Sequence, residues 1–253
     1  MTRSPELDAV IDMIRAAGLV ESGASIQDRR ALLEGVATPV ADDVSVEPVD
    51  AGGTAAEWVR APGVAAPSTD GPVVVHLHGG GYTSGSCNTH RTFGVSLSAQ
   101  VGAPVLMVDY RLAPEHPFPA ALDDAVAALA WVTDSVGIDA SRVVLSGDSA
   151  GGGLAVSALV ARRDAGAAPI AGAVLLSPWA DLAMVGASHD TEVGADPMCS
   201  RSSLGPSAEA YRGEAPADDP GVSPAYADLS GLPPLLFHVG QVEVLRDDSV
   251  VLA

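Results

Sequence analysis

Short, almost uninterrupted runs of apolar residues recur along the chain from residue 73 onward. Such runs are typical of strands buried on both faces of a parallel sheet. Apolar positions at helical spacing fill three of the intervals between them. The predicted strands span residues 73–78, 103–110, 142–147, 170–178 and 234–240, and the predicted helices span 91–101, 120–135 and 150–164. This alternation predicts an α/β fold with a doubly wound, mostly parallel sheet.

Two segments depart from the alternation. Residues 1–45 carry apolar positions at helical spacing, which predicts an N-terminal helical cap segment. Residues from about 180 to 222 are rich in Gly, Pro, Asp and Ser, which predicts a cap insertion over the site rather than part of the core. We therefore expect a cap segment at 1–45 and one core domain at 46–253 that carries the insertion.

Composition narrows the class of protein. The chain has 253 residues with 47% hydrophobic content, enough to fill one substantial core. It has 32 acidic residues and 13 basic ones, none of them lysine. The resulting net charge of -19 argues against a nucleic-acid partner.

The sequence shows few features that indicate a cellular location. Cys87 and Cys199 lie outside any C-x-x-C spacing, so neither a metal site nor a disulfide is predicted, and a reducing cytoplasm fits best. The first residues lack the basic and apolar regions of a secretory signal. No apolar run approaches the roughly 18 residues of a membrane span.

The segment 143–153, VVLSGDSAGGG, places Ser149 between a β-branched run and a small-residue helix. Glycine stands two residues to either side, which is the form of a nucleophile elbow. Gly147 and Gly151 have no Cβ to collide in so sharp a turn. Ser149 is therefore the predicted nucleophile, held in a strained backbone conformation.

Three glycines follow the predicted strand at 73–78 in the sequence HGGGY. Ligand sites of open α/β sheets lie at this carboxyl edge, where backbone N–H groups can turn toward a developing oxyanion. Gly80 and Gly81 are the predicted donors. The third is the N–H of Ala150, which follows the nucleophile at the positive end of its helix.

Four separated motifs, HGGGY, DYRLAPEHPFPAALDD, GDSAGGGLA and SPWADL, resemble the hormone-sensitive-lipase family of α/β-hydrolase esterases. They occur in the family's order from roughly residue 55 to the end of the chain. The resemblance implies an α/β-hydrolase fold with a helical cap, no cofactor and no metal. It also implies hydrolysis of short-chain acyl esters or of lactones. Tyr82 and Trp179 are expected to line the substrate pocket.

The acid of the triad is expected after the strand at 234–240. Glu243 is our choice, because it stands three residues after Gly240, where the resemblance places Asp or Glu. A solvated loop carboxylate is the plainer alternative for Glu243. Asp247 and Asp248 are expected to cap the helix that follows.

The histidine does not fit the expected order of serine, acid and histidine. The family places it about 30 residues after the acid, whereas the chain ends at Ala253, so we expect a truncated chain. His76 and His238 are expected in the core, His78 and His116 in turns, and His90 and His189 in loops or the cap, and all six precede Glu243.

Three functions remain open. The first is a cytoplasmic serine carboxylesterase, weak in this chain because the serine has no base. The second is a ligand-binding, receptor-like member of the same fold, and the third is an inactive fragment. A small ester or lactone is the expected partner, and an exposed sheet edge leaves a homodimer open.

Overall fold

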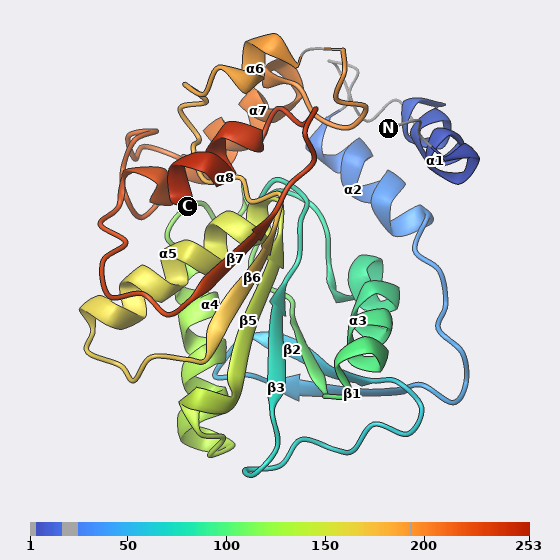
Figure 1. Ribbon diagram of the computed structural model, residues 1–253, viewed down its shortest axis with the longest axis vertical. Helices are drawn as coiled ribbons and strands as arrows, with labels where there is room; N and C mark the ends of the chain where they lie inside the picture. The colour runs from blue at the N-terminus through green and yellow to red at the C-terminus, as the bar shows by residue number, and fades with distance from the viewer. Residues whose placement is uncertain (1–3, 17–24, 193) are drawn as a thin grey trace.

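A seven-stranded sheet forms the centre of the computed structural model, which describes residues 4–16, 25–192 and 194–253 (Figure 1). The strand order is β1-β2-β4-β3-β5-β6-β7. The strands are β1 (Ser45–Asp50), β2 (Ala55–Arg60), β3 (Val73–Leu77), β4 (Val105–Val108), β5 (Val143–Asp148), β6 (Gly172–Leu176) and β7 (Leu235–His238). β4, β3, β5, β6 and β7 run parallel, whereas β2 is antiparallel to both β1 and β4. The predicted mostly parallel α/β-hydrolase sheet is confirmed.

Helices cover both faces of the sheet. They are α1 (Pro5–Ala16), α2 (Ile26–Gly35), α3 (Cys87–Val101), α4 (Ala120–Ala130), α5 (Ala150–Asp164), α6 (Ser188–Thr191), α7 (Arg201–Arg212) and α8 (Arg246–Leu252). α4 and α5 lie on one face and α3 on the other (Figure 1). Because both faces are covered, every residue of β3 and β4 is buried.

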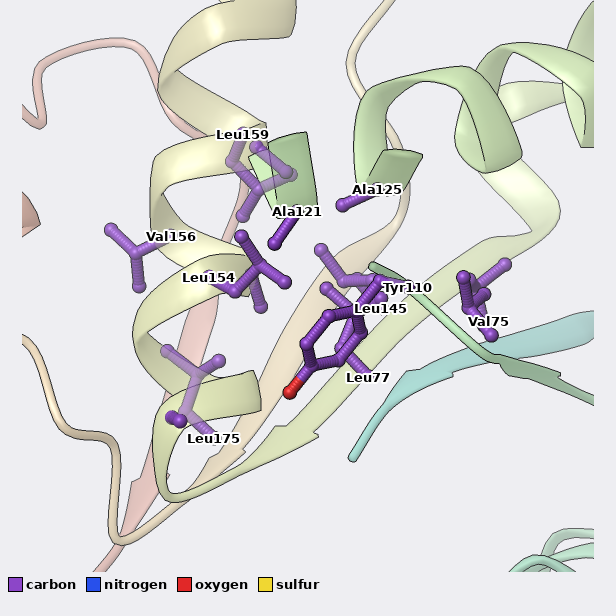
Figure 2. Close-up of a cluster of buried hydrophobic side chains, with 14 of the residues drawn as sticks. Val75, Leu77, Tyr110, Ala121, Ala125, Leu145, Leu154, Val156, Leu159 and Leu175 are labelled. Atoms are coloured by element: carbon purple, nitrogen blue, oxygen red, sulfur yellow. The ribbon is translucent and has the colours of Figure 1, made fainter. Parts of the chain in front are cut away.

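The larger hydrophobic core lies between the sheet and the pair α4 and α5 (Figure 2). Leu154 of α5 and Ala121 of α4 face Leu77 and Leu145 of the central strands, and all four are fully buried. Alanine and glycine dominate the packed side of α5, so this helix lies close to the sheet. This packing holds the start of α5 at the end of β5.

Helix boundaries follow local capping. α5 spans the predicted residues 150–164. α3 begins at Cys87 rather than at residue 91, because Ser86 accepts a hydrogen bond from the N–H of Thr89 and forms a capping box with it. The predicted helix at 120–135 is the α-helix α4 followed by a π-helical turn, Trp131–Ser135.

The helices of the two predicted cap regions gather over one end of the sheet. α1, α2, α6 and α7 lie at the end where β5 passes into α5 (Figure 1). α1 and α2 belong to the segment predicted as an N-terminal cap, and α6 and α7 belong to the predicted insertion. The division of the chain near residue 45 stays a prediction.

The edge strand β7 contradicts the expectation that His238 is a core residue. β7 is an edge strand and its burial alternates, so Leu236 is 62% exposed. His238 is also exposed, and the prediction that it is a core residue was wrong. The apolar run at 234–240 indicated a strand correctly, but it did not reveal that the strand has a neighbour on one side only.

Candidate active site

Ser149 occupies the sharp turn between β5 and α5. Its backbone angles are φ 52° and ψ −121°, a region that residues with a side chain seldom adopt. A Cβ on Gly147 would overlap the carbonyl group of Gly151, and a Cβ on Gly151 would overlap the carbonyl group of Leu77. Both glycines are therefore needed to hold the strained serine where the sequence predicted it.

The glycine turn after β3 lies beside this elbow because β3 and β5 are parallel neighbours, with Leu77 opposite Gly147. Gly80 and Gly81 have φ values of 125° and 64°. The carbonyl of Gly80 points into its own turn, where it accepts the N–H groups of Thr83 at 3.2 Å and Ser84 at 3.0 Å.

The predicted oxyanion donors lie close to Ser149. Gly80, Gly81 and Ser149 line the same cavity, and Ala150 is the first residue of α5. No hydrogen bond within the described part of the chain uses the N–H groups of Gly80, Gly81 or Ala150. These amides can therefore stabilise a negative charge that develops next to the Ser149 side chain.

Asp148 ties the elbow to the glycine turn. Its Oδ1 accepts the N–H of Gly79 at 2.9 Å. His76 Nε2 lies 3.3 Å from the same oxygen, and His90 Nε2 lies 3.6 Å from Oδ2. Burial alone would raise the pKa of Asp148, but hydrogen bonds and charge interactions with the two imidazoles outweigh it and hold the pKa well below its ordinary value.

His78 stabilises the start of the glycine turn. Its Nδ1 donates to the carbonyl of Gly79 at 2.8 Å, and its ring stacks on Tyr110 with the ring centroids 4.3 Å apart. Burial, and next the neighbouring His90, lowers the pKa of His78 from 6.5 to about 3. The imidazole is therefore neutral in the folded protein at neutral pH.

Acid is expected to destabilise the fold through His78. Between pH 6.5 and about 3 the unfolded chain binds a proton that the folded chain does not, so stability is fully present above pH 6.5 and falls as the pH falls. The loss approaches about 1.4 kcal/mol per pH unit within this window. Urea unfolding at pH 7, 5.5 and 4.5 should show a smaller loss in His78→Phe, which keeps the stacking but cannot titrate.

His116→Phe is the matched control, because His116 is exposed. This variant is expected to lose stability with falling pH as steeply as the parent chain. Equal slopes for the parent chain and His78→Phe would contradict the assignment of this proton to His78.

Glu243 lies in the turn after β7 and lines a cavity together with Ser149. Its Oε1 accepts the N–H of Gly240 at 2.7 Å, which folds the carboxylate back onto its own turn. The structure therefore brings the predicted acid to the nucleophile's surroundings, and one carboxylate oxygen is engaged by the backbone. The catalytic role of Glu243 stays a prediction.

Asp247 and Asp248 do not cap α8, which corrects the expectation for both. The N-cap of α8 is Leu245, and it makes no side-chain capping bond. Asp248 Oδ2 instead accepts the N–H groups of Ala180 at 2.8 Å and Asp181 at 2.9 Å. Asp247 Oδ2 accepts the N–H of Ser188 at 2.9 Å. Both carboxylates therefore join the inserted segment to α8. Their oxygens accept backbone N–H groups from that segment instead of those at the start of α8.

Asp196 makes a second connection that the sequence analysis missed. Its Oδ1 accepts the N–H groups of Met198 and Cys199, and its Oδ2 accepts the N–H of Val244 at 2.9 Å. Val244 follows Glu243, so Asp196 joins the inserted segment to the turn of the predicted acid. No motif or spacing singles it out, because the contact spans distant parts of the chain.

Two cavities meet at Ser149. One has a volume of about 270 Å³ and lies on the side of the glycine turn, bounded by residues of α2 and α7. The other has a volume of about 480 Å³ and lies on the side of Glu243, bounded by residues of α1 and β6. Asp148, Ser149, Met198 and Cys199 line both cavities. A substrate carbonyl bound at Ser149 therefore has room on either side.

Tyr82 and Trp179 lie behind the glycine turn rather than on a cavity wall. Both are almost completely buried, and neither lines the two cavities at Ser149. Tyr82 stacks on Tyr211 with centroids 3.8 Å apart, and its hydroxyl donates to the Trp179 carbonyl at 3.3 Å. Their positions do not support the expected substrate contact, since aromatic rings near a motif also serve to pack the loop that carries it.

The other histidines are distributed around the site. His90 lies in α3, not in a loop, and lines the smaller cavity. His189 is fully buried in α6, with Nε2 3.7 Å from Asp248 Oδ1. None of the six histidines lines the larger cavity, which holds Ser149 and Glu243.

Cys87 and Cys199 are free thiols. Within residues 4–16, 25–192 and 194–253, no group of three or more His, Cys, Asp or Glu side chains is arranged to hold a metal ion. None of the helices in these ranges combines the length and the apolar character that crossing a membrane requires.

The strained serine, the glycine turn and the parallel sheet are typical of one class of protein, the α/β hydrolases. Comparison with known proteins supports this assignment. A family model described as the α/β-hydrolase fold matches residues 74–253. The chain belongs to this family.

Curated relatives of the chain are named as hydrolases. An acetyl-hydrolase of Streptomyces hygroscopicus is 43% identical over 256 residues, covering 98% of this chain and 82% of that protein. The carboxylesterase NlhH of Mycobacterium tuberculosis is 36% identical over 192 residues, covering 72% of this chain and 59% of NlhH. The chain therefore spans only part of the length of these relatives.

Solved structures agree with this assignment. A structure of EstE5 is 44% identical, with a TM-score of 0.92, and the match covers 99% of this chain and 83% of that one. An esterase from the bacterial hormone-sensitive lipase family is also 44% identical, with a TM-score of 0.92, covering 100% of this chain and 84% of that one. The resemblance drawn from the four motifs is confirmed.

Proposed function

We propose that the protein hydrolyses carboxylic esters through an acyl-enzyme on Ser149. The Ser149 hydroxyl attacks the ester carbonyl, and the amides of Gly80, Gly81 and Ala150 receive the negative charge on its oxygen. Glu243 orients the base that accepts the serine proton, and water then releases the acid. The observation that carries the proposal is the strained serine lying beside three amides that make no other hydrogen bond among the described residues.

Short acyl esters, or lactones, are the substrate class that we infer. The 43% identical relative is named an acetyl-hydrolase, and a crystal of EstE5 was soaked with p-nitrophenyl butyrate. The cavity beside the glycine turn, about 270 Å³, is lined in part by Leu33 of α2 and Leu204 of α7. These walls favour a short apolar acyl group.

A receptor-like binding protein is the weaker alternative. Such a protein needs no oxyanion donors, yet the N–H groups of Gly80, Gly81 and Ala150 make no hydrogen bond among the described residues. The relatives also carry the names of hydrolases rather than of receptors.

We further infer a cytoplasmic location and leave a homodimer as a proposal. The two free thiols suit a reducing compartment. The half-exposed β7 leaves one edge of the sheet open to another chain.

Hydrolysis of p-nitrophenyl acetate, butyrate and decanoate tests the proposal. The protein is expected to cleave acetate and butyrate at least about tenfold faster than decanoate. A folded protein that cleaves none of the three esters would overturn the proposal.

A further inference from the structure

The glycine turn after β3 needs support from outside its own residues. Gly80, Gly81 and Tyr82 follow one another with φ values of 125°, 64° and 60°. A residue with a side chain, such as Tyr82, seldom adopts a positive φ, and it keeps one only where the surrounding structure fixes it. The start of the turn is held by the hydrogen bond from Gly79 to Asp148. The end of the turn requires a different partner.

Arg30 of α2 is that partner. Its Nε donates to the carbonyl of Thr83 at 2.6 Å, and its Nη2 donates to the carbonyl of Ala113 at 2.7 Å. Ala113 in turn donates its N–H to the carbonyl of Tyr82 at 3.0 Å. A planar fork of N–H donors suits this place, because it reaches two carbonyls at once. One guanidinium therefore joins the end of the glycine turn to the segment that follows β4.

Glu115 forms an ion pair with the same guanidinium. Its Oε1 accepts Nη1 of Arg30 at 2.9 Å and its Oε2 accepts Nη2 at 2.7 Å, which makes the pair bidentate. The Glu115 side chain is 51% exposed and that of Arg30 is 27% exposed. An ion pair so accessible to water contributes little by itself. The contacts with the two backbone carbonyls therefore provide most of the support for the turn.

α2 is attached to its neighbours on both sides of Arg30 in the sequence. Arg29 Nη1 donates to the carbonyl of Ser203 of α7 at 3.0 Å. Glu34 Oε2 accepts Nδ2 of Asn88 of α3 at 2.8 Å. These contacts fasten α2 to the inserted segment and to the core, and they keep the guanidinium of Arg30 at the glycine turn.

We propose that Arg30 is a positioning residue, which holds the end of the glycine turn so that the amides of Gly80 and Gly81 face the developing oxyanion. This inference rests on the proposed ester hydrolysis. Arg30 lines neither cavity at Ser149, so it is not placed to contact a substrate there. Its effect passes through Thr83, whose N–H donates to the Gly80 carbonyl at 3.2 Å. A displacement of about 1 Å at a catalytic group can cost about 100-fold in rate.

The test compares the parent chain with Arg30→Met and Arg30→Lys in the hydrolysis of p-nitrophenyl butyrate. Arg30→Met is expected to lower kcat about 10- to 100-fold and to change KM less than about threefold, because the oxyanion develops only in the transition state. Formation and hydrolysis of the acyl-enzyme both pass through an oxyanion, so kcat falls whichever step is slower. Arg30→Lys should recover part of the loss but stay at least about threefold below the parent chain, since an ammonium group cannot reproduce the planar fork.

Arg163→Met is the matched control. Arg163 likewise donates to two backbone carbonyls, those of Asp228 and Ser230, and to the carboxylate of Asp164. Its side chain is 25% exposed, close to the 27% of Arg30. It lies near the far end of α5, roughly 20 Å along the helix from the elbow. This variant is expected to keep kcat within about twofold of the parent value, because it leaves the glycine turn untouched.

Glu115→Gln separates the carbonyl contacts from the ion pair, and it is expected to keep kcat within about threefold of the parent value. Urea unfolding checks that each variant is folded, and if Arg30→Met is unfolded, Arg30→Lys takes its place in the comparison. Three outcomes would overturn the inference: equal kcat for Arg30→Met and Arg163→Met, a loss in Arg30→Met that lies wholly in KM, or an equally large loss in Glu115→Gln. In each of these cases ester hydrolysis by the parent chain still stands, whereas a folded parent chain that cleaves no ester would refute the proposed function itself.

Discussion

Ser149→Ala is expected to lower kcat for p-nitrophenyl butyrate by about 10⁵- to 10⁶-fold. The strained turn presents this hydroxyl to the cavity beside the amides of Gly80 and Gly81, and alanine removes the atom that forms the acyl-enzyme. Release of p-nitrophenol in a stopped assay measures the loss. Ser207→Ala is the control, since Ser207 lines the same cavity but lies on α7, and this variant should retain most of the activity.

Hydrolysis that persists in Ser149→Ala would contradict the assignment of Ser149 as the nucleophile.

Gly151→Ala is expected to destabilise the fold by about 3 kcal/mol or more. A Cβ at this position would overlap the carbonyl groups of Leu77 and His78, which belong to the backbone of β3 and the glycine turn. These atoms cannot rotate away as a side chain does, so α5 would have to move off the sheet. The midpoint of urea unfolding measures the effect.

Gly35→Ala is the matched control for this prediction. A Cβ at Gly35, the last residue of α2, would meet no atom within 4 Å, and its φ is not positive. This variant is expected to change the free energy of unfolding by less than about 1 kcal/mol, and in the stabilising direction. Equal midpoints for the two variants would show that the elbow tolerates a side chain.

Prediction from the sequence succeeded where the signal was local and strong. α5 has its predicted bounds, because a strand, an elbow and a small-residue helix follow one another directly along the chain. The central strands were recognisable because burial on both faces leaves an uninterrupted apolar run. β7 was recognised as a strand by the same signal, but its alternating exposure at the sheet edge was not foreseen.

Roles that depend on distant partners were harder to predict. Asp247 and Asp248 resemble helix caps in the sequence, yet they bind N–H groups of the inserted segment. Tyr82 follows the glycine turn directly, but its ring stacks on Tyr211 of α7 and is buried. Neither partner is adjacent in sequence, so local patterns carry no information about these contacts.

The sequence by itself determined the sheet, the strained serine and the glycine turn, because each depends on residues that are close together or on a simple burial period. Only the tertiary structure decided how these parts surround Ser149. The register of β3 and β5 brings the glycine turn to the serine, and Asp196 joins the inserted segment to the turn of Glu243. The packing of α1, α2 and α7 over the serine creates two cavities. Packing and hydrogen bonds between distant segments depend on the whole chain at once, and for that reason no single stretch of sequence reveals them.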